Sequence, residues 1–218
     1  MRSLLAVTLL SISLPLQAQP DPNDELLDQE PPFSYLFLSA AATRDRDREL
    51  DVTAEGFSLG GSVDLSENVF LTAGYSHSET GEFQFQGPLG TSQAEVEDDG
   101  FSIGLGGHKT LTRRTDLTTS LAYVNSRTKL SQAGQPSEES RSEGGSASLG
   151  LRHLIHPWIE VSAGSSYSFV AGERGWDWSG GMGFMMTRKV WMDIDYYRSA
   201  GQDSDGWSLG LRTVLAAD

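Results

Sequence analysis

The stretch EGFSLGGSVDL, residues Glu55–Leu65, alternates bulky apolar residues with small or polar ones. Phe57, Leu59, Val63 and Leu65 lie on one face of an extended strand, and the residues between them are glycine, serine and aspartate. Because the period is two rather than 3.6, the stretch predicts a β-strand with one apolar face and one small, polar face.

The beginning of this strand recurs along the chain. An acid, a glycine, an aromatic residue, a serine, an aliphatic residue and a second glycine return at Asp99–Leu105 (DGFSIGL) and Asp205–Leu215 (DGWSLGLRTVL), and a weaker copy begins at Glu143 (EGGSASLGL). The first copies are evenly spaced, since 99 − 55 = 44 and 143 − 99 = 44. Each copy falls where a long connection ends and a strand begins, so the repeating unit is a hairpin.

Period-two alternation continues through the chain and predicts an all-β protein of about ten strands, with eight as the alternative. The strands are expected near 33–43, 55–65, 69–78, 99–108, 116–127, 144–154, 158–169, 175–186, 190–198 and 206–215. Short connections alternate with longer polar ones at 44–54, 79–98, 128–143 and 199–205, and the short 170–174 connection is an exception. This arrangement predicts an up-and-down antiparallel transmembrane β-barrel.

The N-terminal residues differ from the rest of the chain. Residues 1–18 combine Arg2, an apolar run at Leu4–Leu14 and a small residue, Ala18, which together predict a secretory signal peptide. Residues 19–32, QPDPNDELLDQEPP, are acidic and proline-rich, and predict a periplasmic segment before a barrel at 33–218.

Charge and cysteine content exclude several functions. The chain has 30 acidic and 16 basic residues, and removing the signal peptide removes Arg2 and no acid, so the mature net charge is 15 − 30 = −15. So acidic a chain is not expected to bind nucleic acid by neutralising phosphates. The absence of cysteine excludes thiol catalysis and cysteine-ligated zinc.

The two faces of the strands favour a membrane barrel over a soluble one. A soluble barrel would bury the bulky face, whereas a membrane barrel turns it toward lipid. On the bulky face, aromatic residues gather near the long-loop end, Phe33, Tyr35 and Phe184 lie near the opposite end, and aliphatic residues lie between. The aromatic belt expected at the long-loop end is Phe57, Tyr75, Phe101, Tyr123, Tyr167, Trp176, Trp178, Tyr196 and Trp207.

The alternating faces, the aromatic belts, the hairpin spacing and stretches such as ENVFLTAGYSHSE and DGFSIGLGGH together indicate one family. On these features, residues 33–215 resemble the small outer-membrane barrels of Gram-negative bacteria. That group includes the OmpA transmembrane domain and OmpX. The resemblance implies a porin-like fold in the cell outer membrane, in contact with lipid and lipopolysaccharide and inserted by the barrel-assembly machinery. One departure is the C-terminus: such barrels usually finish on an aromatic residue, whereas Leu215 is followed here by Ala-Ala-Asp.

The small, polar face carries charges that would lie inside the barrel. They are Asp64, Arg152, Glu160, Asp177, Asp193, Asp195 and Arg212. A last hairpin centred between Ala200 and Asp205 would place Arg212 opposite Asp193, and Arg152 would face Glu160 across the 154–157 turn. These pairs would close the lumen as a salt-bridged plug. The alternative is a narrow pore, and five acids against two arginines would make it prefer cations.

Two glycine- or aspartate-rich motifs are explained by strands and turns. Gly104–Gly107 has the composition of a dinucleotide loop, but no helix follows it to hold a phosphate. Glu97–Gly100 and Asp203–Gly206 contain fragments of a calcium loop without its later ligands, and fit the turn chemistry of aspartate and glycine. We therefore expect no cofactor and no metal site, with diffuse divalent-cation binding beside lipopolysaccharide as the alternative.

A catalytic role is weighed for one histidine. His77 lies near the long-loop rim, but Ser76 and Ser78 face away from it on an ideal strand, so a serine–histidine pair is not formed. Asp98 and Asp99 are its candidate acidic partners. A rim hydrolase is the least favoured hypothesis, and the protein is expected not to be an enzyme.

The outer loops offer another route to function. Arg44–Asp51 alternates in charge, and Phe83 and Phe85 lie on the otherwise polar tip of the 79–98 connection, where they could contact a surface. The favoured hypothesis is a monomeric, non-enzymatic barrel that supports envelope integrity or surface adhesion through its extracellular loops. The alternative is the narrow, cation-preferring pore.

Overall fold

A computed structural model describes residues 37–48, 51–87, 90–132, 134–156, 158–187, 189–200 and 204–215. The expected signal peptide, the 19–32 segment, Phe33 and Tyr35 lie outside these residues. The strands are β1 (Phe37–Asp47), β2 (Val52–Ser66), β3 (Val69–Thr80), β4 (Phe83–Gly87), β5 (Gly90–Thr112), β6 (Thr115–Gln132), β7 (Glu138–His156), β8 (Ile159–Val170), β9 (Glu173–Met185), β10 (Val190–Ser199) and β11 (Ser204–Val214). Within the described ranges, no helix is long and apolar enough to cross a membrane.

Ten of these strands close into an antiparallel barrel. Neighbours along the chain pair with one another, β3 pairs with β5, and β1 closes the ring by pairing with both β2 and β11. The short strand β4 stands outside this ring and pairs with the beginning of β5. The prediction of an all-β, up-and-down barrel of ten strands is confirmed.

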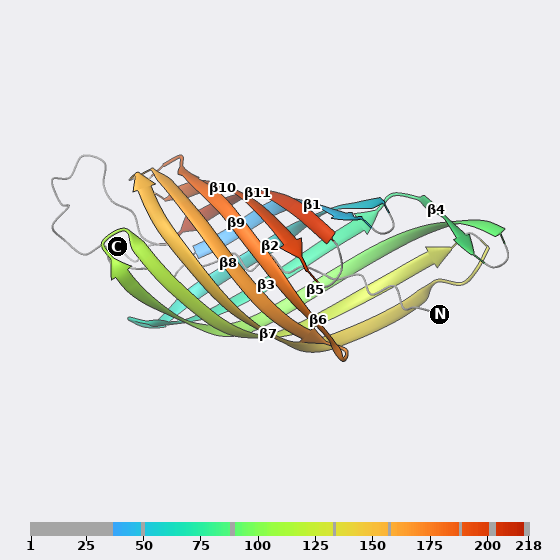
Figure 1. The fold of residues 1–218 in the computed structure, drawn as a ribbon, viewed down its shortest axis with the longest axis horizontal. Coiled ribbons are helices and arrows are strands. Elements are labelled where there is room, and N and C mark those ends of the chain that lie inside the picture. Colours follow the sequence, from blue (N-terminus) through green and yellow to red (C-terminus); the bar gives the residue numbers. More distant parts are fainter. Residues whose placement is uncertain are drawn as a thin grey trace.

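The long-loop end of the barrel differs from the prediction. The 79–98 and 128–143 connections were expected as loops, but most of their residues extend β5, β6 and β7 and form the β4–β5 hairpin. Figure 1 shows these strands running beyond the ends of the others, with β4 at their tip. We call the parts of β4–β7 beyond the barrel rim the extended sheet. On β5, polar residues such as Gln93 and Glu95 face outward, while Ala94 and Val96 are buried on the inward face. The outward-facing apolar residues that reveal a membrane strand are therefore missing from the described part of this stretch.

Smaller differences concern the first strand and one aromatic side chain. The first strand was expected at 33–43 and is described at Phe37–Asp47. Phe70 breaks the alternation because it points into the lumen, where its side chain is buried. Gly106 lies opposite Phe70 in the β3–β5 ladder, and the Phe70 ring occupies the space that a side chain at Gly106 would need.

Candidate functional site

The aromatic residues expected in the outer belt lie on the outside of the barrel wall. The exposed ones are Phe57, Tyr75, Phe101, Tyr123, Trp176, Trp178 and Trp207, while Tyr167 and Tyr196 are partly covered. Tyr167 packs on Trp176 with ring centroids 5.1 Å apart, and Tyr196 packs on Trp207 at 4.7 Å. Leu59, Ile103, Leu121 and Leu209 are exposed on the same surface, so a broad apolar band surrounds the barrel.

Two tyrosines mark the long-loop border of this band. The Tyr75 hydroxyl donates to Asp99 Oδ1 at 2.7 Å, and the Tyr123 hydroxyl donates to Glu143 Oε2 at 2.9 Å. Each ring therefore lies on the apolar wall while its hydroxyl reaches a carboxylate above it. This is the arrangement of a side chain at a membrane–water interface.

Inside the barrel, Arg212 is fully buried. Its Nε donates to Asp193 Oδ2 at 2.9 Å and its Nη2 donates to Asp193 Oδ1 at 3.0 Å. The guanidinium also lies over the Trp191 ring, 5.1 Å from the centroid. The expected register is wrong by two residues, because Arg212 is opposite Trp191 and Asp193 is opposite Gly210. The ion pair forms diagonally, since the long arginine side chain spans the offset.

A second buried ion pair lies near the short-turn end. Arg152 Nε donates to Glu160 Oε1 at 2.8 Å, and Nη2 donates to Glu160 Oε2. In the β7–β8 ladder Leu154 is opposite Glu160 and Arg152 is opposite Ser162, so this pair is also diagonal. Asp116 lies directly opposite Arg152 in the β6–β7 ladder.

Sequence reasoning missed His108 and Asp116 as members of this buried network. Both side chains are almost completely buried, with His108 Nδ1 3.7 Å from Asp116 Oδ2. His108 Nε2 lies 2.7 Å from the carbonyl oxygen of Glu67. Both residues fell at the ends of the predicted strands 99–108 and 116–127, on either side of the expected 109–115 turn. Continuing the alternation from Gly104 and Gly106 would have placed His108 inside.

Two other expected lumen acids, Asp177 and Asp195, accept hydrogen bonds from serine hydroxyls. Asp177 accepts from the Ser166 hydroxyl at 3.4 Å, and Asp195 accepts from the Ser208 hydroxyl at 3.4 Å. Asp64 lies near the short-turn end of β2, opposite Phe70, and is half-buried.

Large side chains fill the lumen toward the short-turn end. Phe37, Phe70, Trp191 and Arg212 are each exposed by no more than 1%. They come from β1, β3, β10 and β11, which lie in one half of the ring around its closure. Together with Arg152 they place both bulk and compensated charge inside the barrel.

The mouth of the lumen at the long-loop end carries two acids beyond the aromatic belt. Burial, followed by the charge of Asp98, raises the pKa of the Asp45 carboxyl to about 7. Burial also raises the pKa of Asp98 to about 6, against the opposing effect of the hydrogen bond from Thr128 at 2.5 Å.

Gly206 lies opposite both Asp45 and Tyr197, and a Cβ there would overlap the Asp45 carboxylate and the Tyr197 hydroxyl. The glycine of the repeated phrase therefore makes room for these side chains.

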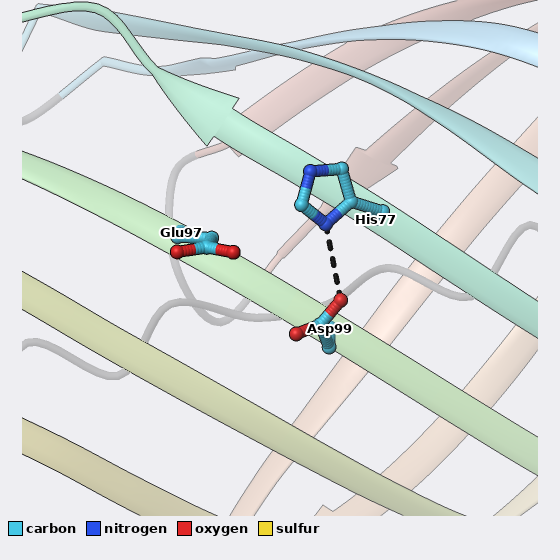
Figure 2. A group of neighbouring side chains, drawn as sticks. All are labelled: His77, Glu97 and Asp99. Atoms are coloured by element: carbon cyan, nitrogen blue, oxygen red, sulfur yellow. Dashed lines mark hydrogen bonds and ion pairs between the residues drawn. The ribbon is translucent and has the colours of Figure 1, made fainter.

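A cluster of three possible ligands lies on the outside of the wall, just above the belt. His77, Glu97 and Asp99 each offer one ligand atom, and these atoms lie within 4.8 Å of one another (Figure 2). His77 Nδ1 is 3.0 Å from Asp99 Oδ1, and Lys129 Nζ is 3.1 Å from Glu97 Oε2. The hydrogen bond from Tyr75, followed by that from His77, lowers the pKa of Asp99. Of the two candidate partners for His77, Asp99 makes the contact, whereas Asp98 faces the lumen.

Comparison with known proteins shows the fold alone. No protein-family model and no curated protein matches the chain. The transport unit of the autotransporter AIDA-I from Escherichia coli is similar with a TM-score of 0.53, at 11% identity over 88% of this chain and 93% of that chain. The NanC porin has a TM-score of 0.50, at 10% identity over 82% of this chain and 100% of that chain. Ail, the attachment invasion locus protein of Yersinia pestis, has a TM-score of 0.42, at 14% identity over 82% of this chain and 95% of that chain.

The closed ring, the apolar outer band and these structural neighbours define one class. The chain has the fold of an outer-membrane β-barrel. A porin and the transport unit of an autotransporter share this fold, so the fold alone is compatible with more than one activity.

Proposed function

We propose that this protein is a non-enzymatic barrel of the outer membrane with a closed lumen, which acts at the cell surface through its extended sheet. The observation that carries the proposal is the length of β5–β7 beyond the aromatic belt. On β5 the belt residue is Phe101 and the strand begins at Gly90, so 101 − 90 = 11 residues extend past the belt. At about 3.3 Å per residue, the strand continues for roughly 35 Å beyond that level.

The edges of the extended sheet support a role in recognition. Among the described strands, β4 pairs with β5 alone, and β7 residues before Glu143 pair with β6 alone. A strand edge of this kind presents backbone donors and acceptors to which an extended segment of a partner can pair.

The outward face of the extended sheet carries several ion pairs. Lys129 contacts Glu97 at 3.1 Å, and Arg127 contacts Glu139 at 2.7 Å. Such a face stays soluble beyond the membrane and favours a partner that binds by backbone pairing or polar contacts. Exposed ion pairs like these contribute little to the free energy of unfolding. We therefore assign them a role in solubility or in recognition of a partner.

A narrow, cation-preferring pore is the second candidate. It is favoured by the carboxyls of Asp45 and Asp98 at the lumen mouth. The buried Trp191, Arg212 and Phe70 argue against it, because a conducting path would have to pass them.

Removing the β4–β5 hairpin tests the surface role. Thr80 Oγ1 accepts from the Val96 amide at 2.8 Å, so the two strands are close enough to be rejoined there. We would replace residues 81–95 with an Asn-Gly turn, which suits a tight hairpin. Binding of cells to an array of immobilised glycans and proteins would be measured. Cells producing this variant should no longer bind the array components that wild-type cells bind.

A matched variant controls for loop changes in general. Replacing residues 133–137 with a Gly-Ser segment of equal length alters the β6–β7 tip but not the β4 edge. It should retain binding, and both variants should keep heat-modifiable migration on gels, the sign of an intact barrel. Equal array binding by wild-type cells and by cells carrying the shortened hairpin would refute the role of the hairpin.

A further inference from the structure

The outward cluster of His77, Glu97 and Asp99 lies where β3 and β5 leave the apolar band. His77 and Asp99 are directly opposite each other in the ladder, one outward-facing step above the belt pair Tyr75 and Phe101. Glu97 is the next outward-facing residue on β5. The cluster is therefore held by two hydrogen-bonded strands rather than by a loop, which favours a defined geometry.

Neighbouring side chains already orient two of the three groups. The Tyr75 hydroxyl donates to Asp99 at 2.7 Å and fixes one oxygen of this carboxylate. The His77 ring packs against Phe57, with ring centroids 5.6 Å apart. Supporting contacts of this kind orient the ligands of metal sites in proteins.

The donor set selects among metal ions. Calcium and magnesium prefer oxygen ligands alone, whereas an imidazole favours zinc and other first-row transition ions. One nitrogen and two carboxylate oxygens make three protein ligands, which leaves a position for water or an external ligand in a four-coordinate zinc site. His77 and Asp99 side chains are 24% and 30% exposed, so the ion can reach them from solvent.

We propose that His77, Glu97 and Asp99 form a binding site for a divalent transition-metal ion, with Zn²⁺ as its best-matched occupant, on the outer wall of the barrel. The bound ion would tie β3 to β5 at the root of the extended sheet. This metal-site proposal does not depend on the proposed surface function, because the three ligands come from the barrel wall and need no partner protein.

The neighbouring cation Lys129 gives the site a specific signature. Lys129 is 3.1 Å from Glu97 and competes with a metal ion for the same carboxylate. Removing the ammonium while keeping the side-chain stem should therefore tighten metal binding. A surface cluster with no metal function would show no such response.

Isothermal titration of the untagged, detergent-solubilised barrel with Zn²⁺ tests the proposal. We expect one ion per chain, at least tenfold weaker binding in His77→Ala, Glu97→Gln and Asp99→Asn, and tighter binding in Lys129→Met. Glu95→Gln on the same face of β5 and His153→Ala at the opposite end are matched controls that should bind as wild type does. Heat-modifiable migration would verify that each variant is folded.

Spectroscopy and competition provide the second measurement. Co²⁺ added to the wild-type protein should give visible absorption bands of a low-coordinate site, and these bands should be absent in His77→Ala. An excess of Ca²⁺ should not displace Zn²⁺. Absence of Zn²⁺ binding, unchanged affinity in His77→Ala, or displacement by Ca²⁺ would overturn the proposal.

Discussion

Removing the positive charge of Arg212 should destabilise the barrel strongly. Arg212 is fully buried and donates two hydrogen bonds to Asp193, which is itself mostly covered. Arg212→Met keeps most of the side-chain volume but leaves the Asp193 carboxylate inside the lumen without its cation. Breaking a buried pair on one side costs about 3–5 kcal/mol. Loss of the cation–π contact with Trp191 adds about 0.5–2 kcal/mol.

A double variant separates the charge effect from the packing effect. Asp193→Asn combined with Arg212→Met removes both charges and should recover most of the loss, to within about 1–3 kcal/mol of wild type, the cost of an unsatisfied buried amide. The free energy of unfolding would be measured by urea titration in lipid vesicles, with tryptophan fluorescence as the signal. The reasoning is refuted if Arg212→Met is as stable as wild type, or if the double variant is no more stable than the single one.

Two further predictions concern the lumen. Gly106→Ala places a methyl group in the space of the Phe70 ring and should cost about 1–3 kcal/mol in the same urea titration. Gly107→Ala, whose Cβ would meet its nearest atoms at 3.5 Å and 3.7 Å, should be close to neutral, and equal losses in the two variants would contradict the placement of Phe70. Because the pKa of Asp45 is raised to about 7 from 3.8, the folded state holds a proton that the unfolded chain has lost, so stability should fall as pH rises from about 4 to 7 and level off above. Asp45→Asn should reduce this fall, and an unchanged pH profile would contradict the burial of the carboxyl.

The barrel and its two faces could be predicted from sequence because lipid and lumen impose opposite demands on alternate residues. Leu59, Ile103 and Leu209 all lie on the lipid-facing side, so the period-two alternation could be recognised in the sequence. Phe70 breaks the alternation because its ring fills the space left by Gly106, which is 106 − 70 = 36 residues away. Only the register between β3 and β5 brings the two together.

The sites were less predictable, for reasons of register and length. A two-residue offset in the β10–β11 ladder leaves the Arg212–Asp193 contact intact, because arginine is long enough to reach diagonally. His77 and Asp99 fell within the expected strands 69–78 and 99–108, whereas Glu97 fell within the expected 79–98 loop. Only the longer β5 brings Glu97 beside the other two. Among its described side chains, the first part of β5 has polar residues on its outward face and only Ala94 and Val96 as buried apolar residues, so it lacks the outward apolar face by which the membrane strands were recognised.

The central claim is that buried side chains close the lumen, and single-channel recording in planar bilayers tests it most directly. The purified wild-type protein should insert without producing steady current steps. Arg212→Ala, which removes the guanidinium that lies over Trp191, is the variant in which openings should first appear. Steady, ion-selective openings of the wild-type barrel would contradict the account and favour the cation-preferring pore.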